Sequence, residues 1–262
     1  MSFVDHWIAH PQGRLFAREW PATTDGAALS PVVLQHDSLG CIDVWRDFPE
    51  RLAVATGRRV IAYDRLGFGR SDARADRVPR DFIAEEGRTF LPAVLAQLGV
   101  ERFAVSGHSV GGGMAVNIAA QRPDACTALV TIAAQAFVED RTIAGLHAAR
   151  ASFAEPGALE RLARYHGDKA AWVLSAWLDT WLDPAFADWS LDDVLPQVRC
   201  PALVLHGELD EYGSAAHPQR IARGIGERAT MQLLAGLGHV PQRERPDEVV
   251  ARVAGLLARG GA

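Results

Sequence analysis

The feature that most constrains this chain is the pentapeptide Gly107-His-Ser-Val-Gly111, which separates an apolar run from a helical one. Residues 102–106 have the composition of a short buried strand, and residues 114–121 have the periodicity of a helix. A serine on a sharp turn from strand to helix has strained backbone angles and an exposed hydroxyl, and only small residues fit two positions away on either side. The pattern therefore predicts that Ser109 is a nucleophile on such a turn.

A serine hydroxyl becomes a good nucleophile only when a base takes its proton and a carboxylate orients that base. An apolar run begins at residue 200 and ends in a polar turn that carries Asp210. Residues 229–235 read as another strand, which is followed by a glycine-rich loop that ends at His239. Both side chains are expected just beyond the carboxyl ends of strands, so Ser109, His239 and Asp210 form a predicted catalytic triad.

Strands and helices alternate along most of the chain. Apolar runs predict strands at residues 6–9, 14–20, 31–36, 59–63, 103–106 and 128–133. Helical spacing predicts helices at residues 43–56 and 82–98, and Pro92 should kink or restart the second of these. Such alternation favours an α/β fold with a mostly parallel sheet, in which ligands bind beyond the carboxyl ends of the strands.

Five motifs occur in order along the sequence. They are Gln35-His-Asp-Ser-Leu-Gly40, Tyr63-Asp-Arg-Leu-Gly-Phe-Gly-Arg-Ser-Asp72, the serine turn, Gly207 to Asp210, and Gly238-His-Val-Pro-Gln-Arg-Glu-Arg-Pro246. On these motifs the chain resembles the α/β-hydrolases over nearly its whole length. The resemblance implies the α/β-hydrolase fold, a central sheet flanked by helices, and the chain order Ser, Asp, His is the one found in that family.

The alternation stops between about residues 137 and 196, where the spacing is helical and no strand is evident. An insertion at this place resembles the helical cap of many α/β-hydrolases. We therefore predict a core domain formed by residues 1–136 and 197–262, with residues 137–196 as the cap. Four of the seven tryptophans lie in this insertion. Most large aromatic side chains are packing residues, but a cap closes over a pocket, and Trp177 and Trp181 are the predicted lining.

Acyl transfer builds negative charge on the former carbonyl oxygen, which backbone N–H groups stabilise in an oxyanion hole. One expected donor is the N–H of Val110, directly after the nucleophile. Ser38 matches the second donor of many relatives, although Asp37 stands where glycine is usual. Asp tolerates left-handed backbone angles better than most residues, so the loop can still form. The loop also resembles that of the 3-oxoadipate enol-lactonases, which have Asn in place of Asp37.

Composition excludes several classes of protein. The net charge is −5, with 27 basic and 32 acidic residues interspersed, so the chain lacks the electrostatic signature of a nucleic-acid-binding protein. No apolar run approaches the ~18 residues of a membrane span, and the first residues do not read as a signal peptide. The three cysteines are widely spaced, and we expect buried thiols in a cytoplasmic protein. No metal-ligand spacing and no dinucleotide fingerprint occur, so neither a metal nor a cofactor is predicted.

These observations predict a cofactor-free serine hydrolase that acts on a small, largely apolar carboxylic ester or lactone. Two enzymatic alternatives keep the triad: hydrolysis of a carbon–carbon bond in a dienoic ring-cleavage product, and peracid formation in the manner of haloperoxidases. A third alternative is a hydrolase-like receptor with slow turnover. A serine nucleophile argues against the dehalogenases and epoxide hydrolases of this fold, which use Asp. The expected partner is a small molecule, and the sequence leaves the oligomeric state open.

Overall fold

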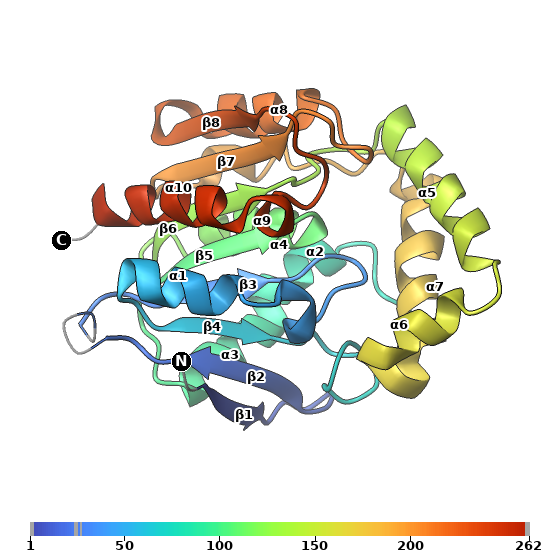
Figure 1. Cartoon of the computed structure of the whole chain (residues 1–262), viewed down its shortest axis with the longest axis horizontal. Coiled ribbons are helices and arrows are strands. Elements are labelled where there is room, and N and C mark those ends of the chain that lie inside the picture. The colour runs from blue at the N-terminus through green and yellow to red at the C-terminus, as the bar shows by residue number, and fades with distance from the viewer. Residues whose placement is uncertain (1–2, 24–25, 27, 260–262) are drawn as a thin grey trace.

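One eight-stranded sheet forms the centre of the molecule (Figure 1). A computed structural model of the chain describes residues 3–23, 26 and 28–259. The spatial order of the strands is β1-β2-β4-β3-β5-β6-β7-β8. Their bounds are β1 (Val4–Ile8), β2 (Leu15–Trp20), β3 (Val32–Gln35), β4 (Val60–Tyr63), β5 (Phe103–His108), β6 (Cys126–Ile132), β7 (Ala202–Gly207) and β8 (Ala229–Leu234).

Strands β3 to β8 run parallel, whereas β2 is antiparallel to both β1 and β4. The predicted mostly parallel α/β fold is therefore confirmed. The chain leaves β3 toward β4 on one side and returns to form β5 on the other side of β3. Loops that follow β3 and β5 thus separate at the carboxyl edge of the sheet, where open parallel sheets bind ligands.

Helices cover both faces of the sheet, and each layer buries its own apolar core. On one face α1 and α10 pack against β3, β4 and the neighbouring strands, as Leu52, Val253 and Leu257 illustrate. On the other face α3, α4 and α8 contribute side chains such as Leu91, Val116 and Ile221. The bounds are α1 (Phe48–Thr56), α2 (Phe82–Glu85), α3 (Leu91–Gln97), α4 (Val110–Gln121), α8 (Ala216–Ile225), α9 (Pro241–Glu244) and α10 (Pro246–Arg259).

Two predicted helices are each divided into shorter elements in the structure. Residues 43–56 divide into a 3₁₀ turn, Ile42–Trp45, and helix α1, because Arg46 between them has a φ of 55°. The predicted helix at 82–98 divides into α2, a π-helical turn at Glu86–Phe90, and α3. Pro92 lies in the first turn of α3, where its missing N–H costs no hydrogen bond, so the expected restart at this proline is confirmed.

Three helices lie beyond the carboxyl ends of the parallel strands (Figure 1): α5 (Asp140–Phe153), α6 (Ala158–His166) and α7 (Ala170–Trp181). An isolated antiparallel bridge between Phe137 and Ser190 joins the two ends of this segment. Residues 1–2, 24–25, 27 and 260–262 of the proposed core segments lie outside the described residues. In the part of the chain that the structure describes, no helix has both the length and the apolar character needed to cross a bilayer.

Candidate active site

Ser109 occupies the turn between β5 and α4 with φ 55° and ψ −125°, a conformation that non-glycine residues rarely adopt. Close backbone contacts explain the flanking glycines. A Cβ atom on Gly107 would lie 1.9 Å from the carbonyl oxygen of Gly111. A Cβ atom on Gly111 would lie 2.2 Å from the carbonyl oxygen of Gln35. The local sequence thus holds the serine hydroxyl at the carboxyl edge of the sheet.

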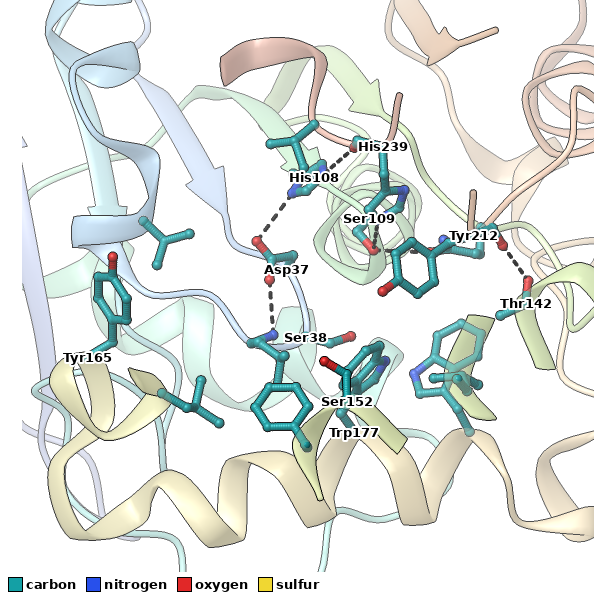
Figure 2. A pocket seen from close by; sticks show the side chains of 18 of the residues that line it. Asp37, Ser38, His108, Ser109, Thr142, Ser152, Tyr165, Trp177, Tyr212 and His239 are labelled. Carbon is teal, nitrogen blue, oxygen red and sulfur yellow. Dashed lines mark hydrogen bonds and ion pairs between the residues drawn. The ribbon is translucent and has the colours of Figure 1, made fainter. Parts of the chain in front are cut away.

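The three residues of the predicted triad meet at this edge, and Figure 2 shows two of them, Ser109 and His239. Nε2 of His239 lies 3.1 Å from Oγ of Ser109, and its Nδ1 lies 2.9 Å from both carboxylate oxygens of Asp210. Asp210 follows β7 and His239 follows β8, so adjacent strand ends bring them together. The contacts have the distances that proton transfer from serine to histidine requires.

Asp210 is held as a carboxylate by its surroundings. Oδ1 accepts hydrogen bonds from the backbone N–H groups of Tyr212 (2.8 Å) and Gly213 (3.1 Å). Burial acts to raise the pKa of this carboxyl, but the hydrogen bond and the charge of His239 outweigh burial, and the pKa lies below its ordinary value. An ionised Asp210 fixes the tautomer of His239 with its proton on Nδ1, which leaves Nε2 free to accept the proton of Ser109.

The two residues predicted to supply the oxyanion hole adjoin Ser109, since Val110 follows it in the chain and Ser38 lines the same cavity. Val110 is the first residue of α4, where helix geometry provides no acceptor for the N–H. Ser38 belongs to a turn closed by a hydrogen bond from the Gly40 N–H to the Asp37 carbonyl oxygen (3.2 Å), a bond that does not use the Ser38 N–H. The Asp37 carbonyl also accepts from Nη2 of Arg65 and Nδ1 of His36, each at 2.8 Å. These contacts fix the peptide unit that carries the Ser38 N–H.

Asp37 lines the same cavity with its side chain paired. Oδ1 accepts from the Leu39 N–H (2.9 Å), and Oδ2 lies 3.3 Å from Nδ1 of His108. Nε2 of His108 lies 2.8 Å from the carbonyl oxygen of His239. His108 therefore joins the loop of Asp37 to the loop of His239. Burial acts to raise the pKa of Asp37, yet the hydrogen bond and charge of His108 outweigh it, and the pKa lies well below its usual range.

The cavity above Ser109 has a volume of about 480 Å³ and lies between the strand ends and α5–α7. Trp177 and Trp181 both line it, as does Asp37. Trp181 is only 3% exposed and also packs edge-on against Phe186, whereas Trp177 faces the ring of Tyr212 (Figure 2). Trp181 therefore packs against neighbouring aromatic side chains and also lines the cavity. Trp177 lines the cavity and is less deeply buried.

Comparison with known proteins agrees with this architecture. A family model described as the alpha/beta hydrolase fold matches residues 30–178, more than half of the chain. The chain belongs to the α/β-hydrolase family.

Individual relatives of this α/β-hydrolase are distant. It is 28% identical to the dihydrolipoyllysine-residue acetyltransferase component of the acetoin cleaving system of Pseudomonas putida, an alignment that covers 89% of this chain and 65% of that protein. It is also 28% identical to lipase LipV of Mycobacterium tuberculosis over 76% of this chain and 83% of that one. The enol-lactonase of Burkholderia xenovorans superposes with a TM-score of 0.72 at 22% identity, covering 97% and 100% of the two chains, a likeness of fold.

Sequence reasoning missed several residues of this site in the α/β-hydrolase. Oε1 of the buried Gln135 lies 3.3 Å from Oγ of Ser109, and Tyr212 lies over the ring of His239 with centroids 4.9 Å apart. Gln135 follows β6, so the rule that ligands bind beyond the carboxyl ends of strands could have found it. His36 and His108 hold loops beside the site through their ring nitrogens.

The cysteines form a pair that their spacing did not reveal. Sγ of Cys126 and Sγ of Cys200 are 3.7 Å apart because β6 and β7 are neighbours, and both side chains are buried. Burial raises the pKa of Cys41 to about 12, which keeps this thiol protonated. Within residues 3–23, 26 and 28–259, no three His, Cys, Asp or Glu side chains are placed to hold a metal ion.

Proposed function

We propose that this α/β-hydrolase cleaves small, largely apolar carboxylic esters or lactones through an acyl-enzyme and without a cofactor. The observation that carries the proposal is the line of contacts from Ser109 Oγ to His239 Nε2 and from His239 Nδ1 to Asp210. The apolar lining formed by Leu146, Trp177 and other side chains supports a substrate with little charge next to the scissile bond.

In the first half of the proposed reaction, Oγ of Ser109 forms a bond to the substrate carbonyl carbon while Nε2 of His239 takes the hydroxyl proton. The N–H groups of Ser38 and Val110 donate to the resulting oxyanion. The carbon–oxygen bond to the leaving group then breaks, and His239 gives its proton to the departing oxygen. Asp210 stabilises the imidazolium that exists between these two transfers.

In the second half, water adds to the acyl carbon and gives its proton to His239. The bond from the acyl carbon to Ser109 Oγ breaks, the proton returns to Oγ, and the carboxylic acid leaves. Each backbone donor of an oxyanion hole typically supplies about 10²–10³ in rate. The same machinery serves an ester or a lactone, since a lactone differs only in that its leaving group remains attached.

The test is turnover of a panel of p-nitrophenyl acetate, butyrate and octanoate, with labelling of Ser109 by a fluorophosphonate followed by mass spectrometry. We expect steady turnover, a mass increase on the peptide that contains Ser109, and loss of both in Ser109→Ala. A single burst of p-nitrophenol without later turnover would favour the receptor alternative. Steady turnover that persists in Ser109→Ala would reject the proposed nucleophile.

A further inference from the structure

The cavity has two chemically different sides. Thr142, Trp177 and Tyr212 lie on one side of Ser109, and Tyr165 lies on the opposite side, beyond Asp37 and Ser38 (Figure 2). Arg161 is one helical turn before Tyr165 on α6, so both project from the same face of that helix. Arg243 of α9 also lines the cavity, and its guanidinium bonds to Val44 in the loop after β3. One side is therefore neutral, and the other carries two guanidinium groups.

Arg243 is held in place by a backbone carbonyl oxygen. Its Nε and Nη2 atoms both donate to the carbonyl oxygen of Val44, at 2.9 Å and 2.6 Å. These contacts orient the planar guanidinium and leave its Nη1 atom for another acceptor. In the described part of the chain, no carboxylate forms an ion pair with Arg243. Burial of the side chain lowers the pKa of its guanidinium. The guanidinium charge is partly desolvated, and the side chain lines the cavity.

Arg161 adds a second charge at the solvent-exposed end of the same side. Among the described residues it too has no ion pair, and Tyr165 beside it is 46% exposed. Asp37 is the single carboxylate among the lining residues, and its oxygens are engaged by Leu39 and His108. Within the described residues, no carboxylate pairs directly with either guanidinium group, and the charge of Asp37 acts on Arg243 only through space.

We infer that the substrate carries a carboxylate at the end remote from its scissile carbonyl, and that Arg243, with Arg161 and Tyr165, binds this carboxylate. The inference rests on the proposed ester or lactone hydrolysis and names the substrate class for it. A guanidinium presents donors in a plane that matches the two oxygens of a carboxylate. The neutral side, with Leu146 and Trp177, would then receive the uncharged part of the substrate.

The kinetic test uses matched pairs of esters that differ in one charge. Monoaryl esters of succinic, glutaric and adipic acid are compared with their methyl-capped diesters, and 4-carboxyphenyl butyrate with 4-carbamoylphenyl butyrate. The measured quantity is the ratio of kcat/KM between the anionic and the neutral member, corrected for their uncatalysed hydrolysis. We expect at least one pair to favour the anion, and Arg243→Gln to lower that ratio about tenfold, the loss typical of one charge-assisted hydrogen bond.

Arg161→Gln should lower the same ratio by a smaller factor, because its side chain is exposed. Arg164→Gln is the matched control, since Arg164 is also an exposed arginine of α6 and does not line the cavity. Any general effect of a substitution on activity cancels in the ratio. Arg243→Lys retains the charge and should keep part of the preference. Equal ratios in the wild type, Arg243→Gln and Arg164→Gln would overturn the inference.

A binding measurement separates this inference from the proposed function. In the Ser109→Ala background, calorimetry compares monomethyl adipate with dimethyl adipate. Tighter binding of the monoester, lost in the Ser109→Ala, Arg243→Gln double variant, supports the carboxylate site even if no ester is hydrolysed. Turnover of neutral esters with no preference for either ligand would reject the carboxylate site and leave the proposed hydrolysis intact.

Discussion

The guanidinium of Arg65 donates a hydrogen bond to the carbonyl oxygen of Asp37 over 2.8 Å. That carbonyl belongs to the same planar peptide unit as the N–H of Ser38, so the orientation of one fixes the orientation of the other. A cation on the carbonyl also polarises the peptide and strengthens its N–H as a donor. Arg65 is buried, and its backbone N–H donates to Nε2 of His36. Arg65 thereby orients and polarises the peptide that carries the proposed oxyanion donor, the Ser38 N–H.

We therefore predict that Arg65→Met lowers kcat by about 10²-fold, close to the loss of one oxyanion donor, with little change in KM. Arg65→Lys should recover part of kcat. Because Arg65 also offsets the charge of the buried Glu86, the Arg65→Met, Glu86→Gln double variant controls for that loss. Steady-state kinetics and melting temperature are measured together. A fall in stability with an unchanged kcat would limit Arg65 to a structural role.

The second prediction concerns the triad. Ser109→Ala and His239→Ala should each lose about 10⁶-fold in kcat, and the double variant should be no worse, because the residues act as a unit. Asp210→Asn should lose less, about 10⁴-fold, through a wrong tautomer of His239 and a less stable imidazolium. Circular dichroism checks that each variant is folded. Additive losses in the double variant would contradict the shared role of Ser109 and His239.

The two cavity tryptophans should respond differently to truncation. Trp181→Ala removes a buried side chain that packs against Phe186 and Trp189, so we expect about 3–5 kcal/mol less free energy of unfolding. Trp177→Ala should raise KM for octanoate esters more than for acetate esters, with a smaller effect on stability. Urea unfolding and the ester panel measure both quantities. If Trp177→Ala changes only stability, Trp177 is a packing residue.

A larger replacement tests whether α5–α7 select the substrate. Replacing residues 140–193 with a short Gly/Ser linker should expose Ser109 to water and weaken the selectivity among acyl chains. Fluorophosphonate labelling of Ser109 checks that the remaining core is folded. A labelled, active variant with unchanged selectivity would show that α5–α7 do not select the substrate.

Asp37 should affect the preference for anionic substrates in the direction opposite to Arg243. Asp37→Asn removes a negative charge from the lining, so the ratio of kcat/KM for anionic over neutral esters should rise several-fold. Asn also keeps an oxygen that can accept from the Leu39 N–H. Asp37→Val lacks that acceptor and should impair both substrates. An unchanged ratio in Asp37→Asn would mean that the pairing with His108 already cancels the charge of Asp37.

The last prediction concerns the effect of His166 on the free energy of unfolding at acidic pH. His166 of α6 accepts a hydrogen bond from the Gly69 N–H at Nδ1 (2.9 Å), and its Nε2 lies 3.0 Å from the Leu39 carbonyl oxygen, so the ring is neutral. Burial lowers its pKa. As the pH falls, the unfolded chain protonates His166 near pH 6.5, about the ordinary pKa of histidine. The folded chain protonates it only at a lower pH. The stabilisation that neutral His166 gives to the folded state is therefore fully present above about pH 6.5. It decreases as the pH falls toward the lower pKa of His166 in the folded state.

His166→Asn keeps an acceptor for Gly69 but does not titrate, so its free energy of unfolding should depend less on pH between 7 and 5. Exposed His147→Asn is the control. Comparison with the wild type is essential because burial raises the pKa of Asp64 to about 6, which stabilises the fold as the pH falls through that value. Urea unfolding at several pH values gives the difference. Equal slopes in wild type and His166→Asn would contradict the prediction.

Sequence alone predicted the parts of this site that depend on local geometry. Gly107 and Gly111 identify the serine turn because the backbone contacts there exclude any side chain. Asp210 and His239 were found because each follows a strand, and parallel strands bring their carboxyl ends to one edge. The predictions for the strands near Pro31 and Arg59 also agree with β3 and β4.

The remaining features depend on which loops face each other, and single-chain patterns do not contain that information. His108 joins Asp37 to the His239 loop across more than a hundred residues. The π-helical turn at Glu86–Phe90 places Glu86 within 2.6 Å of the Tyr63 hydroxyl, a contact between an α-helical region and a distant strand. Arg243 lies within one of the five sequence motifs, but the motif does not reveal that its side chain bonds to Val44 and lines the cavity.

Ser109, Asp210 and His239 all follow strands of the sheet, whereas residues of α5–α7 supply much of the cavity wall. The proposed reacting groups and much of the cavity wall are therefore encoded in separate stretches of the gene, although Asp37 and Arg243 of the core segments also line the cavity. Mutations between residues 140 and 181 can alter what enters the cavity while the reacting groups keep their positions. A new substrate range can then arise from substitutions in these helices, without coordinated changes in the strands that precede the proposed triad residues.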